Sequence, residues 1–215
     1  MKTMDDDGRR GAGWIASRSM RSIVCTILAV AGLASANTAS AATIEREGAR
    51  YEDTVRLANT KLVLNGVGVR GGALFKAFVA GLYLPEKESE AEPVYSAKGP
   101  KRISVRMLLA VGSGLLAKTF GDGIRKNYKD DQLEPLRERM DVFDAQLKAL
   151  NGVDKGDTID LDYQPASGTH LLVNGKARGD AIGGEDFYVA LLKMFIGERA
   201  VDKGLRAGLL GQPAP

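Results

Sequence analysis

The first candidate for chemistry is an arginine in a stretch of small residues. Gly66, Gly68 and Gly71 match the spacing G-x-G-x-x-G, and Arg70 stands just before the last of them. In a dinucleotide site this pattern follows a strand and opens a helix, whose N-terminus binds the pyrophosphate. Residues 74–84 instead have the composition of a strand, so we exclude a dinucleotide site and predict that the glycines form a tight β-turn. Arg70 remains as a permanent cation suited to a carboxylate or a developing oxyanion; the plain alternative is a solvated or salt-bridged surface arginine.

The other titratable residues form no pattern typical of an enzyme. His170 is the single histidine and Cys25 the single cysteine, which excludes a multi-histidine metal site and a Cys-rich zinc module. We therefore expect no metal and no cofactor, and we expect the imidazole of His170 at the surface. Asp160, Asp162 and Asp180 could provide paired carboxylates for acid–base chemistry. The first two alternate with apolar residues, however, which is typical of the solvent side of a strand.

Short apolar runs bounded by turn residues indicate the strands that would position Arg70. They predict strands at residues 61–64, 74–84, 102–111, 156–163 and 168–173. We expect the first to end at the turn pair Asn65-Gly66 and the second at Pro85. The last two form a hairpin, followed by a second turn at Asn174-Gly175. The charged residues 86–92 are expected in a loop or a turn of helix.

Helical periodicity dominates the rest of the chain. One helix is predicted around residues 116–128, and a second spans residues 133–150 with six apolar residues on one stripe. A third closes at Gly197, and Asp202 can cap a last short helix. We predict one α+β domain over residues 42–215, in which a helical layer covers an antiparallel sheet.

Residues 1–41 have the composition of a secretory leader. Two arginines precede an apolar run at residues 23–33, and small residues lead to Ala39-Ser40-Ala41. The run is too short to cross a bilayer, which takes about 20 residues. Together these parts are typical of a signal peptide cleaved before Ala42. We therefore expect a periplasmic or secreted protein with no membrane span after cleavage; an uncleaved anchor is the alternative.

Removal of the leader changes the charge balance. The leader holds five of the 30 basic and three of the 27 acidic residues, so the remaining 174 residues carry a net charge of +1 instead of +3. Nucleic-acid binding loses its main support, because phosphate contacts need clustered positive charge. Three aspartates near Met1 are unusual in a leader, so Met20 is an alternative start. No sequence feature indicates an oligomeric state.

Four segments together resemble bacterial chalcone isomerase-like proteins. They are LVLNGVGVRGGALFKAFVAGLYLPEK (residues 62–87), GPKR (99–102), NGK (174–176) and GGEDFYVALLKMFIGERAVDKGLRAGLLG (183–211). The resemblance covers about residues 45–211 in the same order. It implies the chalcone isomerase fold, an open-faced β-sandwich with a helical layer and a cleft between sheet and helices.

The resemblance also implies roles for individual residues. In the plant enzymes an arginine at the position of Arg70 orients an anionic substrate and stabilises charge on an enone oxygen during ring closure. The enzymes have a threonine where this chain has Phe78, and a tyrosine where it has Leu115. The substrate-polarising hydrogen bonds are therefore missing, and chalcone cyclisation is doubtful.

Other members of the superfamily bind fatty acids without catalysis, with the arginine on the carboxylate. We accordingly expect a non-catalytic binder of a small amphipathic anion, in which Arg70 holds the head. Its cleft would be walled by Phe75, Phe78, Leu82, Leu115, Leu116 and Phe120. Tyr83 could add a hydroxyl beside Arg70, although simple packing against a backbone carbonyl is the favoured alternative. Two further hypotheses stay open: a chalcone–flavanone-type isomerase with Arg70 as catalytic residue, and a structural or partner-binding module of the envelope.

Overall fold

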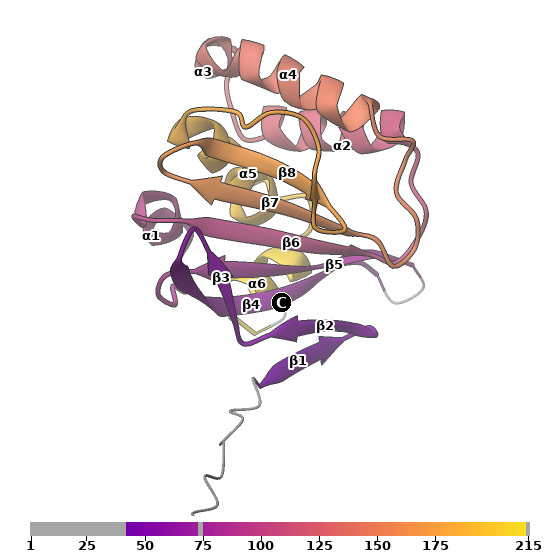
Figure 1. Cartoon of the computed structure of the whole chain (residues 1–215), viewed down its shortest axis with the longest axis vertical. Helices are drawn as coiled ribbons and strands as arrows, with labels where there is room; N and C mark the ends of the chain where they lie inside the picture. Colours follow the sequence, from indigo (N-terminus) through magenta and orange to yellow (C-terminus); the bar gives the residue numbers. More distant parts are fainter. Residues whose placement is uncertain (1–41, 73–74, 214–215) are drawn as a thin grey trace, which may run out of the picture. The chain divides into compact units, whose positions relative to one another are not determined.

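A seven-stranded antiparallel sheet with helices packed on one face forms the fold, as a computed structural model of residues 42–72 and 75–213 shows (Figure 1). The strands follow one another in chain order: β3 (Thr54–Leu57), β4 (Thr60–Gly71), β5 (Lys76–Leu84), β6 (Lys101–Met107), β7 (Thr158–Gln164), β8 (Gly168–Val173) and β9 (Lys176–Ala177). β1 (Thr43–Arg46) and β2 (Ala49–Glu52) pair as a separate hairpin. The predicted α+β class is confirmed. The predicted leader lies outside the described residues.

The helices lie between and after these strands. They are α1 (Ala91–Ser96), α2 (Ser113–Arg125), α3 (Asp130–Leu133), α4 (Arg137–Lys148), α5 (Glu185–Ile196) and α6 (Lys203–Leu209), with a 3₁₀ turn at Glu134–Leu136 before α4. The predicted helix over residues 133–150 is interrupted because Pro135 cannot continue a regular helix. α5 ends at Gly197 and Asp202 caps α6, both as predicted.

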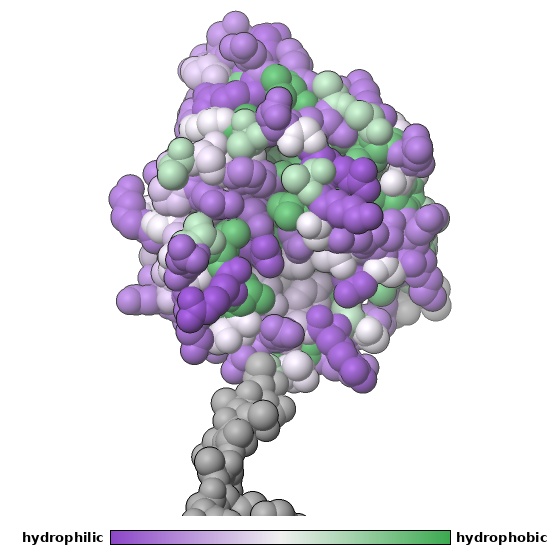
Figure 2. Space-filling model, viewed as in Figure 1, coloured by the Kyte–Doolittle hydropathy of each residue, from purple (hydrophilic) through white to green (hydrophobic). Residues whose placement is uncertain are grey.

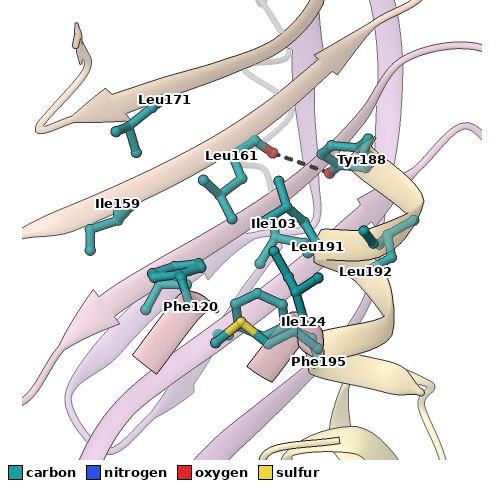
Figure 3. Packing of buried hydrophobic residues seen from close by; sticks show 14 of the residues in the cluster. Ile103, Phe120, Ile124, Ile159, Leu161, Leu171, Tyr188, Leu191, Leu192 and Phe195 are labelled. Atoms are coloured by element: carbon teal, nitrogen blue, oxygen red, sulfur yellow. Dashed lines mark hydrogen bonds between the residues drawn. The ribbon is translucent and has the colours of Figure 1, made fainter. Parts of the chain in front are cut away.

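The main core lies between the helices and what we call the helical face of the sheet. Figure 3 shows Phe120 and Ile124 of α2 and Leu191 and Phe195 of α5 meeting side chains of β6 to β8. Tyr188 also reaches the sheet, and its hydroxyl donates to the Leu161 carbonyl at 3.1 Å. The aromatic rings of Phe78, Phe195, Phe120, Phe143 and Phe187 contact one another edge to face in a continuous row.

β4 contains an irregularity that decides which way Arg70 faces. The pairing register with β5 shifts between Leu64 and Gly66, which marks a β-bulge. Leu62 and Leu64 before the shift and Val67 after it pack in one cluster. A bulge reverses the alternation of faces along a strand. Arg70 therefore lies on the helical face, opposite the cluster that Leu62 and Leu64 enter.

The glycines of β4 serve packing and not a turn. A Cβ on Gly68 would lie 2.3 Å from the carbonyl oxygen of Leu205, and one on Gly66 would lie 2.2 Å from that of Gly208. The backbone of α6 thus rests directly on β4, an approach that only glycine permits. The predicted tight turn at Gly66–Gly71, and the predicted end of the first strand at Asn65-Gly66, are both wrong, since these residues lie inside β4.

The opposite side, which we call the outer face, carries a smaller apolar cluster and a set of polar residues. Tyr51 of β2 packs over Gly81, and its hydroxyl donates to the Val79 carbonyl at 2.9 Å. Further along the sheet, Arg102 holds Asp162 through two hydrogen bonds of 2.5 Å. The surface in Figure 2 is mainly hydrophilic, with hydrophobic residues in small separate areas.

The remaining predicted strands are present with adjusted ends. β5 begins at Lys76, and β6 ends at Met107, earlier than the predicted residue 111. The hairpin of β7 and β8 and the turn at Asn174-Gly175 are confirmed, and Asn174 has a φ of 52°. Of the charged residues 86–92, residues 86–90 form a loop and residues 91–92 begin α1.

Candidate functional site

An apolar cavity of about 370 Å³ opens between the helical face of the sheet and helices α2 and α5. Val105 and Met107 of β6 and Ile159 of β7 line its sheet side, while Met194 and Phe195 of α5 line its helical side. Its volume falls within the range of small-molecule sites. Among the described lining residues, the polar side chains are those of Arg70, Thr119 and Asp202.

Arg70 lies at the end of β4, where that strand reaches the cavity. It pairs across the sheet with Phe78 of β5, so both side chains leave the sheet on the helical face. The guanidinium carbon stands 5.7 Å from the centre of the Phe78 ring, in the geometry of a cation–π contact. Within the described residues, no hydrogen bond or ion pair engages this guanidinium. Its donors are available to an anion.

Five more of the residues singled out from the sequence lie around the same cavity. Phe78 and Phe120 are buried and form part of its apolar wall. Leu115, in the first turn of α2, is 62% exposed, as is Phe75, which precedes β5. Leu116 lines the cavity as well. The structure therefore brings Arg70, Phe78, Leu115 and Phe120 together, and their role in ligand binding stays a prediction.

Tyr83 does not line this cavity. It lies five positions after Phe78 on β5, and an odd separation on a regular strand places two side chains on opposite faces. Tyr83 accordingly joins the outer cluster, where its hydroxyl donates to the Glu52 carbonyl at 3.0 Å. Burial raises the pKa of this phenol. Tyr83 therefore packs with its hydroxyl on a backbone carbonyl, as the favoured alternative predicted. Leu82, which was also proposed as a wall residue, is likewise not among the described residues that line the cavity.

Two polar residues of the cavity were not identified as site residues from the sequence. Thr119 of α2 donates its hydroxyl to the Leu115 carbonyl at 2.8 Å. Asp202 was predicted only as a helix cap, and its Oδ1 does accept the Leu205 amide at 2.8 Å. Its Oδ2 also accepts the amide of Gly71 at 3.3 Å, which ties the start of α6 to the end of β4. The capping pattern gave no signal of this second contact, because it joins segments 131 residues apart.

The carboxylates considered for acid–base chemistry lie away from the cavity lining. Asp162 is only 2% exposed, so its predicted place on the solvent side of a strand is wrong. It is buried because Arg102, directly across from it on β6, neutralises it. Burial raises the pKa of the neighbouring Asp160, whose Oδ1 has no hydrogen-bond partner among the described residues. Asp180 is exposed.

The described residues contain neither a candidate metal cluster nor a candidate membrane-spanning helix. His170 is half-buried with its Nε2 2.7 Å from the Ser167 hydroxyl. In residues 42–72 and 75–213, no group of three or more His, Cys, Asp or Glu is arranged to hold a metal ion. Within the same residues, no helix combines the length and the apolar composition that crossing a membrane requires.

The arrangement can bind a molecule with an anionic head and an apolar body. The head would meet the guanidinium, which offers a planar fork of charged donors. The body would be taken out of water along the aromatic wall, at about 0.8 kcal/mol per buried methylene. The polar groups needed to polarise a substrate carbonyl are scarce, since the Thr119 hydroxyl donates within its own helix.

Comparison with known proteins gives a family match, matches among solved structures and one negative result. A family model described as chalcone isomerase-like matches residues 42–211. Among solved structures, a fatty-acid binding protein of Arabidopsis thaliana superposes with a TM-score of 0.60, at 16% sequence identity. The match covers 79% of this chain and 96% of that chain. No curated protein sequence matches the chain.

Proposed function

Because the chain belongs to the chalcone isomerase-like family, we propose that it is a non-catalytic binder of a small amphipathic monoanion of the fatty-acid type. Arg70 would hold the head and the cavity the apolar body. The observation that carries the proposal is a guanidinium that lines an apolar cavity and forms no hydrogen bond or ion pair within the described residues. The similarity of fold to a fatty-acid binding protein supports it.

The binding test compares Arg70→Ala with a matched control. Decanoate is titrated into wild-type protein and each variant by calorimetry. Loss of a charge-assisted hydrogen bond costs about 1.5–3 kcal/mol, so Arg70→Ala should weaken binding at least tenfold. Arg56→Ala removes the same charge from an exposed position of β3 and should leave the dissociation constant within twofold. Neutral decanol should bind wild type and Arg70→Ala alike. Unchanged decanoate affinity in Arg70→Ala would refute the proposal.

Export is the second part of the proposal, and it rests on the composition of residues 1–41. Native mass spectrometry on protein expressed with its own leader and purified without detergent tests export and ligand together. Cleavage before Ala42 predicts a chain of 174 residues, and a bound carboxylate predicts a reproducible additional mass. Recovery of the protein only inside the cell, with residues 1–41 still attached, would contradict export.

An isomerase remains the alternative in a different functional class. It requires groups that polarise an enone carbonyl in addition to Arg70. Phe78 and Leu115 line the cavity where the enzymes have a threonine and a tyrosine, and neither can donate a hydrogen bond. A binder needs only one cation and an apolar wall, and the cavity has both. An isomerase needs additional hydrogen-bond donors at the positions of Phe78 and Leu115, and these side chains cannot supply them. Acceleration of hydroxychalcone cyclisation by wild type, abolished in Arg70→Ala, would favour the enzyme.

A further inference from the structure

The carboxylate of Asp202 is fixed at the same cavity as Arg70. Two backbone amides hold it: Leu205 donates to Oδ1 at 2.8 Å and Gly71 donates to Oδ2 at 3.3 Å. These amides belong to α6 and to the end of β4, so the carboxylate cannot turn away without losing one of them. Gly71 directly follows Arg70 in the chain, which places the fixed negative charge beside the proposed head-group site.

Asp202 does not neutralise Arg70 by direct contact. In the described part of the chain, no ion pair within 4.0 Å joins the two side chains, although both line the cavity. The described lining of the cavity thus contains one cation and one anion, and its net charge is close to zero. Thr119, the third polar side chain of the lining, is uncharged.

We propose that Asp202 restricts the head group to a single negative charge, so that carboxylates and other monoanions bind and phosphate monoesters are rejected. The inference rests on the proposed function and names the ligand class more narrowly. Coulomb attraction and repulsion grow in proportion to the charge of the head. The cost of removing an ion from water grows more steeply with its charge. A site of near-zero net charge offsets that cost for a monoanion held on Arg70, and it fails to do so for a dianion.

Two ligands with the same tail and similar tetrahedral heads test this inference. Decyl sulfate carries one negative charge, and decyl phosphate carries close to two at pH 8. Both are titrated at concentrations below micelle formation, with decanol as the uncharged reference. Wild type should bind decyl sulfate at least tenfold more tightly than decyl phosphate.

Asp202→Asn removes the charge and keeps a side chain that can cap α6. We expect it to tighten decyl sulfate about threefold and decyl phosphate about tenfold, because the relieved repulsion scales with ligand charge. Decanol affinity should not change. Asp202→Ser, which also retains a capping oxygen, serves as a second variant if the asparagine perturbs the fold. Asp180→Asn makes the same charge change at an exposed position and should leave the ratio of the two affinities at its wild-type value.

The outcomes separate this inference from the proposed function. A sulfate-to-phosphate ratio that is the same in wild type and both Asp202 variants overturns the role of Asp202, as does a wild type that binds the two ligands equally. Failure of wild type to bind decanoate and decyl sulfate, or their Arg70-independent binding, overturns the proposed function and this inference with it.

Discussion

Two cations lie on the helical face of the sheet, near opposite ends of its strands, and their surroundings differ. Lys101 begins β6 and is fully buried, with Nζ 5.1 Å from the centre of the Tyr163 ring and 3.3 Å from Glu185 Oε1. Arg70 is the penultimate residue of β4 and stands over the Phe78 ring in a comparable way. Lys101 has a carboxylate partner and is packed in, whereas Arg70 has no such partner in the described residues and faces a cavity.

Lys101 is therefore a charge that serves the fold, whereas the charge of Arg70 is available to a ligand. A buried ammonium needs a counter-charge, and Glu185 at the start of α5 supplies it, so Lys101 joins the sheet to that helix. At the cavity end, Asp202 lies near enough to line the same space, but its oxygens accept backbone amides. Only the cavity end therefore retains both a charge and a volume for a ligand. Changes at one end should move stability, and changes at the other should move binding.

The largest expected effect comes from the bulge that aims Arg70 at the cavity. Asn65 is 7% exposed, and its Nδ2 donates to the Glu88 and Leu209 carbonyls at 2.8 Å each. Its Oδ1 accepts the Glu88 amide at 2.7 Å. At about 1 kcal/mol per hydrogen bond, Asn65→Ala should lower the free energy of unfolding by about 3 kcal/mol in urea. Decanoate binding should weaken too, because the bulge determines that the Arg70 side chain lies on the helical face of the sheet.

Asn65 also shows why part of the site escaped prediction. Asn-Gly is a strong turn signal, and nothing near it in sequence contradicts a turn. Its side chain is held by Leu209, 144 residues away, so the strand continues for a reason that local pattern does not contain. The same applies to Asp162, whose alternation predicts exposure until Arg102 is placed across from it. The order of β4 to β8 and of the main helices, by contrast, follows from periodicity, whereas β1 to β3 and β9 were not predicted. Tyr83 could have been excluded by its odd separation from Phe78.

Removing the counter-charge of Lys101 should lower the free energy of unfolding less than Asn65→Ala does. Glu185→Ala leaves Lys101 buried without its carboxylate, and it also removes the contact at 3.7 Å to exposed Lys98. We expect a loss of about 2 kcal/mol, less than for a fully buried pair because the Glu185 side chain is 36% exposed. Urea denaturation measures this, and decanoate affinity should stay within twofold. A loss of binding equal to that of Arg70→Ala would erase the distinction between the two ends.

Removing the buried cation itself should stabilise the protein. Burial lowers the pKa of Lys101, and the contact with Glu185 only partly offsets this. Lys101→Met should therefore raise the free energy of unfolding at pH 7 by about 1 kcal/mol. Between the lowered pKa and the ordinary lysine value, the unfolded chain binds more protons than the folded one, so wild-type stability gains as pH rises through that range. The advantage of Lys101→Met should shrink from pH 7 to pH 10 in parallel denaturation curves; a constant difference would contradict it.

The smallest expected effect tests whether the two faces of the sheet are independent. Tyr83→Phe removes one hydroxyl, which donates to the Glu52 carbonyl on the outer face, and leaves the ring packed in its cluster. One hydrogen bond of this kind contributes about 1 kcal/mol, so the urea midpoint should fall slightly. Decanoate affinity should be unchanged, because Tyr83 leaves β5 on the side opposite Phe78 and the cavity. If Tyr83→Phe weakened decanoate as Arg70→Ala is expected to, the hydroxyl would belong to the ligand site, and the assignment of the cavity to the helical face would have to be abandoned.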